Sequence, residues 1–266
     1  MMNKNNLLKV NKCLMAFVLI LFSLATVKAQ NKTEVIAHRG YWQTEGSSQN
    51  SLTSFRKAAE AGVYGSEFDV HLTADNVLVV YHDNKIDGRE IQKCNYKDLT
   101  KIRLFNGEKL PTLEKYLKKA KKQDNIELIF ELKSHESAKR DDEAAKLSVE
   151  MVEKMGLADR TTYIAFSKYA AESLRKYAPN AEVYYLNGDL NPEQLKEMKM
   201  SGFDYHYKVV QKNPEWIKEA HNLGMKVNVW TVNDSDTMKE MVNLGVDYIT
   251  TDHPETAVKV INSYSK

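Results

Sequence analysis

Cysteine is scarce in this chain, since only 2 of its 266 residues are cysteines. Cys13 precedes an apolar run near the N-terminus, an order that argues against a lipoprotein signal, and Cys94 is the one cysteine beyond that run. A single cysteine forms neither an intrachain disulfide nor a cysteine metal cluster. The main part of the chain is therefore not a disulfide scaffold or a thiolate metal site.

Glycine-rich loops of the kind that bind phosphates are also missing. The sequence has no P-loop and no Gly-x-Gly-x-x-Gly pattern. It also shows no repeat with a period of about 20 to 50 residues. These absences exclude the nucleotide-binding motifs that depend on such loops, and they exclude repeat architectures.

An excess of one charge is lacking as well. The formal net charge is +2, from 38 basic and 36 acidic residues, and residues 1–29 hold four of the lysines and no acid. The remaining residues carry 34 basic and 36 acidic side chains, a balance of −2. Charge therefore implies no nucleic-acid partner and no anionic membrane surface, although a local positive pocket is compatible with it.

The longest apolar run lies in residues 1–29. Lysines at positions 4, 9 and 12 precede an apolar run over 14–27, and small residues stand at positions 27 and 29, where a signal peptidase cleaves. This pattern predicts a signal peptide at 1–29 and a secreted or periplasmic chain that begins at Gln30. The run is shorter than the roughly 20 residues of a membrane span, so no stable membrane anchor is expected and an uncleaved anchor is the less favoured alternative.

From Gln30 onward, short β-branched or aromatic runs alternate with helical patterns. Strands are predicted at 35–37, 66–70, 78–82, 126–133, 162–166, 182–186, 205–210, 226–231 and 248–251. Helices are predicted at 52–61, 112–122, 136–155, 168–177, 192–200, 214–223 and 234–244. Regular alternation over a chain of this length favours one α/β domain at 30–266, a (β/α)8 TIM barrel. Nine strands is one too many, and the link between the second and third is too short for a parallel crossover, so one of these two is expected to pair as a hairpin or to lie irregularly in the barrel.

An alternating pair of acids marks the second predicted strand. Successive side chains of a strand point to opposite faces, so Glu67 and Asp69 share one face and Phe68 takes the other. The neighbouring apolar residues indicate a strand covered on both sides. An unpaired carboxylate buried there would cost several kcal/mol, which a metal ion or cationic partners would offset.

Further polar residues fall where predicted strands end. In a (β/α)8 barrel, the carboxyl ends of the strands meet at one mouth, which carries the active site. The residues expected at that mouth are His38, Arg39, Glu67, Asp69, His82, Glu131, Lys133, Trp230, Asn233, Thr251 and Asp252.

This set suits phosphoryl chemistry. Three carboxylates without a thiol suit a hard divalent cation, calcium or magnesium; the alternative is an acid patch neutralised by Arg39 and Lys133. The guanidinium and ammonium groups of these two residues match a phosphoryl group. His38 and His82, at strand ends on either side of the acids, can serve as acid and base because the unperturbed histidine pKa lies near neutral pH.

The other conspicuous residues receive weaker assignments. His71 follows the acid pair and can face outward. Trp230 either packs at the barrel rim or forms an apolar wall for an alcohol group, and these two interpretations are equally favoured. The histidines without a partner motif are assigned to the surface or to packing: His135, His206, His221 and His253.

Seven motifs occur in the order found in the glycerophosphodiester phosphodiesterase family, which this chain resembles over nearly all of 30–266. They are His38-Arg39-Gly40, Glu67-Phe68-Asp69, His82-Asp83, Leu110-Pro-Thr-Leu-Glu114, Phe130-Glu-Leu-Lys133, Trp230-Thr-Val-Asn233 and Ile249-Thr-Thr-Asp252-His-Pro254. The resemblance implies a TIM barrel that hydrolyses a small-molecule glycerophosphodiester to glycerol 3-phosphate and an alcohol with a divalent cation.

The resemblance also implies a role for each matching residue. The implied metal ligands are Glu67, Asp69 and Glu131, the implied acid/base pair is His38 and His82, and the implied phosphate contacts are Arg39 and Lys133. In this family the attacking group is either a metal-activated water or a glycerol hydroxyl that forms a cyclic phosphate. The sequence does not distinguish these routes, and it indicates neither the metal nor an oligomeric state.

Two segments depart from the family pattern. Ser48-Gln49-Asn50-Ser51 stands where the family usually has Pro-Glu-Asn-Thr, so a neutral amide replaces a charged side chain while Asn50 is retained. Residues 84–89 replace a Pro and a Thr-rich turn beside the expected mouth, so the preference for the leaving alcohol is not inherited.

Two alternative functions stay open. One is a phospholipase-like enzyme that acts on lyso- or intact phospholipids, and the other is a non-catalytic barrel that binds phosphodiesters or glycans.

Overall fold

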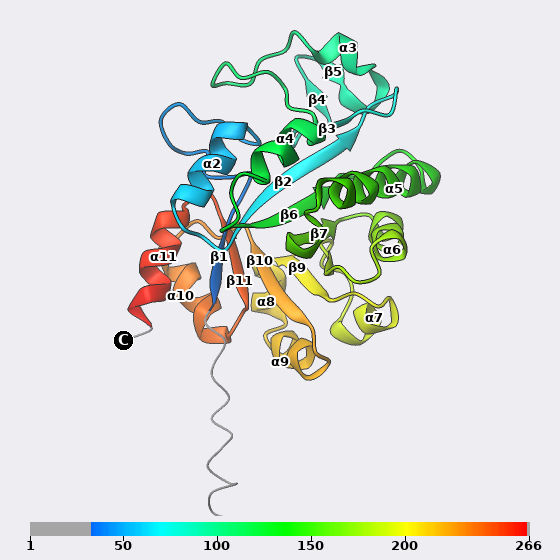
Figure 1. The fold of residues 1–266 in the computed structure, drawn as a ribbon. Helices are drawn as coiled ribbons and strands as arrows, with labels where there is room; N and C mark the ends of the chain where they lie inside the picture. Colours follow the sequence, from blue (N-terminus) through cyan, green and yellow to red (C-terminus); the bar gives the residue numbers. More distant parts are fainter. Residues whose placement is uncertain (1–32, 265–266) are drawn as a thin grey trace, which may run out of the picture. The chain divides into compact units, whose positions relative to one another are not determined.

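Eight parallel strands close into a ring in the computed structural model, which describes residues 33–264 (Figure 1). Each strand pairs with its neighbours in the ring, and β1 pairs with both β11 and β2, which closes the sheet. The predicted (β/α)8 barrel is therefore confirmed. The strands are β1 (Glu34–Ala37), β2 (Gly65–Leu72), β6 (Glu127–Leu132), β7 (Thr161–Ala165), β8 (Val183–Tyr185), β9 (Gly202–His206), β10 (Lys226–Trp230) and β11 (Tyr248–Thr251).

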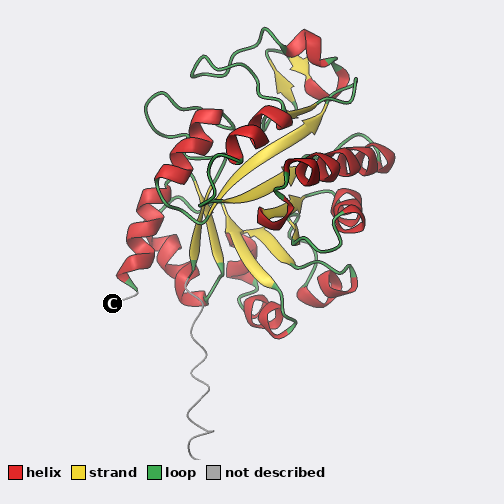
Figure 2. Cartoon of the chain, in the orientation of Figure 1, coloured by secondary structure: helices red, strands yellow, loops and turns green. Residues whose placement is uncertain are grey.

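Helices surround these strands (Figure 2). They are α2 (Leu52–Glu60), α4 (Leu113–Ala120), α5 (Ala138–Met155), α6 (Lys168–Tyr177), α7 (Pro192–Glu197), α8 (Tyr207–Lys212), α9 (Glu215–Asn222), α10 (Ser235–Leu244) and α11 (Pro254–Ser263). Local sequence explains several of their ends. The side chains of Ser51 and Asp234 accept hydrogen bonds from the backbone N–H groups of the first turns of α2 and α10, and Gly156 and Gly245 end α5 and α10 in the left-handed conformation.

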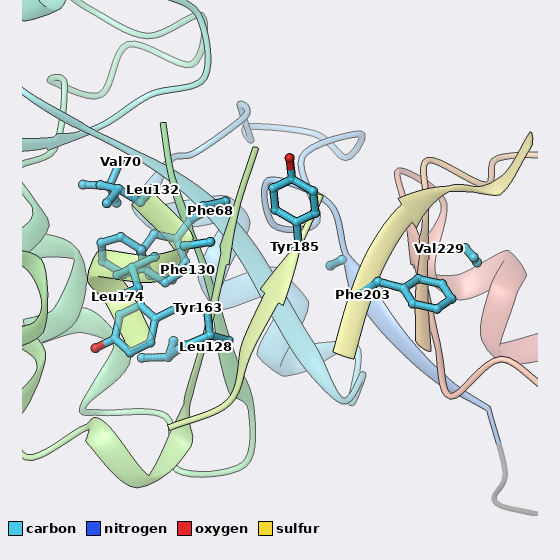
Figure 3. Packing of buried hydrophobic residues seen from close by; sticks show 14 of the residues in the cluster. Phe68, Val70, Leu128, Phe130, Leu132, Tyr163, Leu174, Tyr185, Phe203 and Val229 are labelled. Carbon is cyan, nitrogen blue, oxygen red and sulfur yellow. The ribbon is translucent and has the colours of Figure 1, made fainter. Parts of the chain in front are cut away.

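The alternation of side chains divides the core into two layers. One set of strand residues packs outward against the helices, and Figure 3 shows part of this layer, with Phe68, Phe130 and Tyr163 among its members. The other set fills the barrel interior, where the apolar cluster is much smaller and includes Ile129 and Ile164. The interior therefore has room for polar side chains, as the pattern of β2 predicts.

The ninth predicted strand is β3 (Leu78–Val80), which pairs antiparallel with the end of β2. The hairpin that the short link between these two strands suggests is confirmed. Residues 81–111 follow and form an excursion, which Figure 1 shows beyond the end of β2. It contains β4 (Lys85–Ile86), β5 (Arg89–Glu90), η1 (Ile91–Lys93) and α3 (Tyr96–Leu99), none of which the sequence analysis predicts. Its apolar side chains gather in a separate cluster with Val79.

One predicted strand is wrong. The segment 205–210 divides into the end of β9 and most of α8, and β9 begins three residues earlier than predicted. Gly202 allows that start because a Cβ at this position would lie 2.1 Å from the Lys226 carbonyl oxygen, and only glycine lacks one. The apolar pair Val209 and Val210 belongs to α8, where Val210 is buried against the barrel.

No helix within residues 33–264 is both long enough and apolar enough to cross a membrane. The predicted signal peptide at 1–29 lies outside the described residues.

Candidate active site

The turn that follows β1 is built to hold a carboxylate. Arg39 and Gly40 both have positive φ angles, 55° and 75°. A Cβ on Gly40 would lie 2.5 Å from Ser54 Oγ, so this position requires glycine. The turn directs the Arg39 backbone N–H to Glu67 Oε2 at 2.7 Å, and the Gly40 N–H donates to the Glu67 carbonyl at 3.1 Å. The first motif therefore positions the first acid.

Three carboxylates meet inside the barrel. Asp69 and Glu131 stand opposite each other in the register of β2 and β6, and Glu67 lies two residues before Asp69. One oxygen of each of the three lies within 4.8 Å of the others, and all three residues are buried. The predicted shared face of Glu67 and Asp69 is thus an inward face, and Glu131 joins it.

The three neighbouring carboxylates repel one another unless a cation lies among them. Burial raises the pKa of Glu67 well above its usual value, and the neighbouring Asp69 and Glu131 raise it further. Burial and Asp69 raise the pKa of Glu131 to about 7. Burial opposes the ionisation of Asp69 too, but the charges of Lys133, His82 and Arg39 lower its pKa to about 2.

The donor set fits a hard divalent cation. In the described part of the chain, Glu67 Oε1 is buried without a hydrogen-bond partner, which is costly unless a cation accepts its charge. Three carboxylates within 4.8 Å offer the oxygen ligands that calcium and magnesium prefer. The group Glu67, Asp69 and Glu131 can therefore hold one such ion.

Two basic side chains border the acids. Lys133 Nζ lies 3.2 Å from Asp69 Oδ1 and 2.7 Å from Glu131 Oε1, and Arg39 Nε lies 3.9 Å from Asp69 Oδ2. The alternative of an acid patch neutralised by these two residues thus agrees with part of the geometry. Two cations do not balance three acids, however, so it does not account for Glu67.

The loop before α2 supports both Asp69 and Arg39. Asn50 is fully buried, donates from Nδ2 to Asp69 Oδ2 at 2.8 Å and accepts the Asp69 backbone N–H at 3.1 Å. Its φ of 58° lies in the left-handed region that asparagine tolerates. Gln49 accepts a hydrogen bond from Arg39 Nη1 at 2.8 Å. The unusual Gln49 thus contacts the guanidinium group without neutralising it.

His38 is held by a partly buried acceptor. Its Nδ1 lies 2.8 Å from Asp252 Oδ1, and its Nε2 lies 4.0 Å from Glu67 Oε2. Asp252 also accepts hydrogen bonds from Trp42 Nε1 at 3.0 Å and from Asn233 Nδ2 at 2.7 Å. Burial raises the pKa of Asp252, but the hydrogen bond and charge of His38 outweigh it, and the pKa falls to about 2. The carboxylate leaves the Nε2 edge of His38 directed toward the acids.

His82 also lies near the acids, and it has a different partner. Its Nδ1 lies 2.6 Å from the carboxylate of Asp83, the next residue in the chain. Burial lowers the pKa of His82, and although Asp69 opposes this, Lys133 and Arg39 add to it. A protonated His82 therefore gives up its proton readily.

The suggestion that His71 faces outward is wrong. Its side chain is fully buried, with Nε2 3.3 Å from the His82 carbonyl oxygen and Nδ1 3.0 Å from Gln92 Nε2. Residue 71 has the same strand parity as Glu67 and Asp69, and β2 continues far enough to keep that alternation. Burial lowers the pKa of His71 to about 4, so it is a neutral packing residue that joins β2 to the excursion.

Two cavities meet at His82. A cavity of about 180 Å³ lies over the carboxylates, and its lining includes His38, Arg39 and Trp230. A larger one, of about 560 Å³, lies toward the excursion, and its lining includes Gln49 and Arg103. Trp230 lines the smaller cavity, and its Nε1 donates to the Asp204 carbonyl oxygen at 2.9 Å. The position of Trp230 thus agrees with the apolar-wall interpretation.

Two acids of this site escape prediction from the sequence. Asp252 is predicted only as a strand-end residue, although its place directly after a buried strand gives a signal. Asp204 is missed because the predicted strand begins at Tyr205, three residues after the observed start of β9 and just past Asp204. It lies on the inward face of β9 and lines the smaller cavity.

Known proteins with a similar sequence and fold point to the same chemistry as the geometry of the site. The model of the glycerophosphoryl diester phosphodiesterase family matches residues 38–256. The crystal structure of a glycerophosphodiester phosphodiesterase from Parabacteroides distasonis superimposes with a TM-score of 0.88 at 58% identity, covering 89% of this chain and 99% of that one.

Two more distant proteins match over similar lengths. A glycerophosphodiester phosphodiesterase from Caldanaerobacter subterraneus is 28% identical over 86% of this chain and 98% of its own. An Oleispira antarctica phosphodiesterase, solved in complex with the product sn-glycerol-3-phosphate, shares the fold with a TM-score of 0.74 at 24% identity, covering 86% of this chain and 96% of that one.

Proposed function

This chain belongs to the glycerophosphoryl diester phosphodiesterase family, and from that premise we propose that it hydrolyses glycerophosphodiesters to glycerol 3-phosphate and an alcohol. The Oleispira antarctica relative, which holds glycerol 3-phosphate as its product, supports this substrate class. The single observation that carries the proposal is that three buried carboxylates and two basic side chains lie together beside a cavity that both histidines line.

The carboxylates Glu67, Asp69 and Glu131 hold the divalent cation, calcium or magnesium. When bound, such an ion supplies positive charge that polarises the phosphoryl group and stabilises the charge that develops on it. Arg39 and Lys133 bind the non-bridging phosphate oxygens. Both already lie within 4.0 Å of Asp69, so they are placed beside the ion site.

The two histidines divide the proton transfers. His38, whose Nδ1 lies against Asp252, accepts a proton at Nε2 as the attacking hydroxyl or water approaches phosphorus. His82, which lines the larger cavity, donates a proton to the departing alcohol oxygen, and burial favours this transfer because it lowers the pKa of His82. Trp230 forms an apolar wall of the cavity beside the substrate carbon atoms.

The predicted signal peptide at 1–29 supports a secreted or periplasmic location. Together with the substrate class, it suggests that the enzyme recovers glycerol phosphate from lipid-derived diesters outside the cytoplasm.

The experiment that tests this function is phosphorus NMR of the purified protein with glycerophosphocholine, glycerophosphoethanolamine and glycerophosphoinositol. We expect glycerol 3-phosphate to form with added calcium or magnesium and to stop with a chelator, and relative rates identify the preferred alcohol and metal. The variants Glu67→Gln and His82→Ala should abolish turnover without loss of fold. Full activity in chelator, or in both variants, contradicts the proposal.

A phospholipase-like activity is a second candidate because of one observation in the excursion. Phe105 is 101% exposed and lines the larger cavity, next to the basic Arg103. An exposed aromatic residue with a neighbouring cation can contact a lipid surface. Turnover of lysophosphatidylcholine in vesicles, lost in Phe105→Ser, would favour this candidate, and turnover of glycerophosphocholine alone would exclude it.

A further inference from the structure

We propose that Asp204 binds the terminal hydroxyl of the substrate's glycerol moiety and thereby gives the enzyme its preference for glycerol over shorter polyols. This inference rests on the proposed function, since it assigns one part of the same substrate. It concerns a residue outside the seven motifs that the resemblance rests on.

The position of Asp204 is opposite the carboxylate group. β9 lies four strands from β2 in either direction around the closed ring. Asp204 has the inward parity of its strand and stands beside Asn228 of β10. It lines the small cavity together with Glu67, Glu131 and Trp230. A phosphate bound by Arg39 beside Glu67 and Glu131 thus directs one of its two substituents across the barrel toward Asp204.

The hydrogen bonds of Asp204 leave one oxygen unused. Its carboxyl group bonds with the Asn228 side chain, and its carbonyl oxygen accepts from Trp230 Nε1 at 2.9 Å. Oδ1 is buried and has no hydrogen-bond partner among the described residues, although the residue is only 1% exposed. Such an orphaned buried oxygen costs stability, and buried polar groups of this kind are generally satisfied by a partner. A hydroxyl group of bound substrate supplies that partner.

The charge state of Asp204 agrees with this role. Burial raises its pKa well above the usual aspartate value, and although the hydrogen bond to Asn228 opposes this, Glu131 raises it further. A protonated carboxyl group both accepts and donates a hydrogen bond, so it matches a hydroxyl group and does not repel the nearby phosphate.

The shape of the cavity decides which substituent lies there. Its volume is about 180 Å³, and apolar side chains of Ile164, Phe166 and Leu186 form much of its wall. A three-carbon chain presents C–H groups to such walls and one hydroxyl to the polar floor. The variable alcohol then takes the larger cavity of about 560 Å³ near the excursion. The glycerol moiety is therefore the substituent that reaches Asp204.

The test compares two substrates that release the same alcohol. Glycerophosphocholine carries the terminal hydroxymethyl group, and 2-hydroxyethyl phosphocholine lacks it but keeps the hydroxyl next to the phosphate ester. Both release choline, so one assay measures kcat/KM for both, with the full-length protein and added calcium. The variants are Asp204→Leu, which removes all hydrogen bonding at similar size, and Asp204→Asn, which keeps a donor and an acceptor.

We expect Asp204→Leu to reduce the ratio of kcat/KM for glycerophosphocholine over 2-hydroxyethyl phosphocholine by about tenfold, the effect of one lost hydrogen bond to a buried group. Asp204→Asn should retain most of the wild-type ratio. The melting temperature of Asp204→Leu should stay close to that of wild type, because removal of the orphaned oxygen offsets the lost hydrogen bond to Asn228; a structural residue would lower it.

Three results would overturn the inference. An unchanged ratio of the two kcat/KM values in Asp204→Leu shows that Asp204 does not bind the hydroxymethyl group. Equal loss on both substrates with a lower melting temperature shows a structural role. Failure of wild type to cleave glycerophosphocholine, while it binds calcium, rejects the proposed function itself and the subsite with it.

Discussion

The two candidate catalytic histidines lie in regions of different construction. His38 stands on the barrel, and its partner Asp252 follows the strand that pairs with β1, so both side chains are held by the closed sheet. His82 stands where the hairpin strand enters the excursion, and its partner Asp83 is its neighbour in the chain. The side chains of the first pair are 16% and 14% exposed, and those of the second are 34% and 67% exposed.

The two histidines therefore depend on different contacts for their orientation. Asp252 accepts three hydrogen bonds and stays ionised, so it fixes the orientation and tautomer of His38. Asp83 is mostly in water, where an ion pair contributes little. The orientation of His82 therefore depends on the excursion and on the buried His71 beneath its backbone, rather than on its carboxylate partner.

Removal of either imidazole should have the largest effect on kcat. His38→Ala and His82→Ala should each lower kcat about 10²- to 10⁴-fold, because each removes a proton-transfer group. Choline release from glycerophosphocholine measures the loss, and circular dichroism checks the fold. His221→Ala is the matched control, since His221 pairs with Asp247 away from the cavity and should leave kcat near wild type. Turnover above a tenth of wild type in either active-site variant contradicts its role.

Removal of Asp252, the partly buried partner of His38, should have the next largest effect on kcat. In Asp252→Asn, the amide donates to His38 Nδ1 and leaves the proton on the wrong nitrogen. Loss of a hydrogen bond to a charged group predicts a decrease in kcat of about 10- to 100-fold. Asn233→Ala, which removes one donor to Asp252 but keeps the carboxylate, should have a smaller effect. Equal rates in Asp252→Asn and wild type would show that His38 needs no orienting partner.

The same carboxylate should contribute to stability in a defined pH window. The pKa of Asp252 falls from 3.8 to about 2 on folding, so its contribution is present above about pH 4 and is lost as pH falls through 2. Urea unfolding should show Asp252→Asn to be about 2 kcal/mol less stable than wild type at pH 6, with the difference shrinking toward pH 2. A difference that stays constant with pH would refute this electrostatic origin.

Removal of the Asp83 charge, which belongs to the exposed pair of His82 and Asp83, should have the smallest effect on kcat. Asp83→Asn should change kcat no more than about fivefold, the limit for an exposed ion pair worth up to about 1 kcal/mol. The comparison with Asp252→Asn in the same assay is the sharpest contrast between the two regions. If Asp83→Asn costs as much as Asp252→Asn, both carboxylates act as orienting groups and exposure does not separate them.

Periodicity explains why much of the site can be predicted from sequence. The i, i+2 spacing of Glu67 and Asp69 places both on one face of a strand whatever the surroundings. A parallel barrel then brings the ends of its strands to one mouth, so Glu131 and His38 follow from strand positions alone. His82 reaches the site differently, because β3 runs antiparallel to β2 and returns the chain to Asp69, where the Tyr81 N–H donates to the Asp69 carbonyl oxygen.

The parts that escaped prediction depend on tertiary contacts. The residues 205–210 have a strand-like composition, but His206 is the N-cap of α8, where its Nδ1 accepts the Lys208 N–H at 3.2 Å, and the late predicted start of β9 concealed Asp204. His38 and Asp252 are 214 positions apart in the sequence, and no local sequence pattern indicates a contact over that separation. The excursion has elements of two to four residues, too short for a periodic signal.

The excursion also bears on how such enzymes diversify. Its apolar side chains, among them Ile86, Ile91 and Leu99, pack chiefly with one another and with Val79, so the segment brings its own small core. A segment with its own core can be exchanged without repacking the barrel. Changes in residues 83–109 of the excursion can therefore reshape the larger cavity while the three buried carboxylates and Asp252 keep their positions on the barrel.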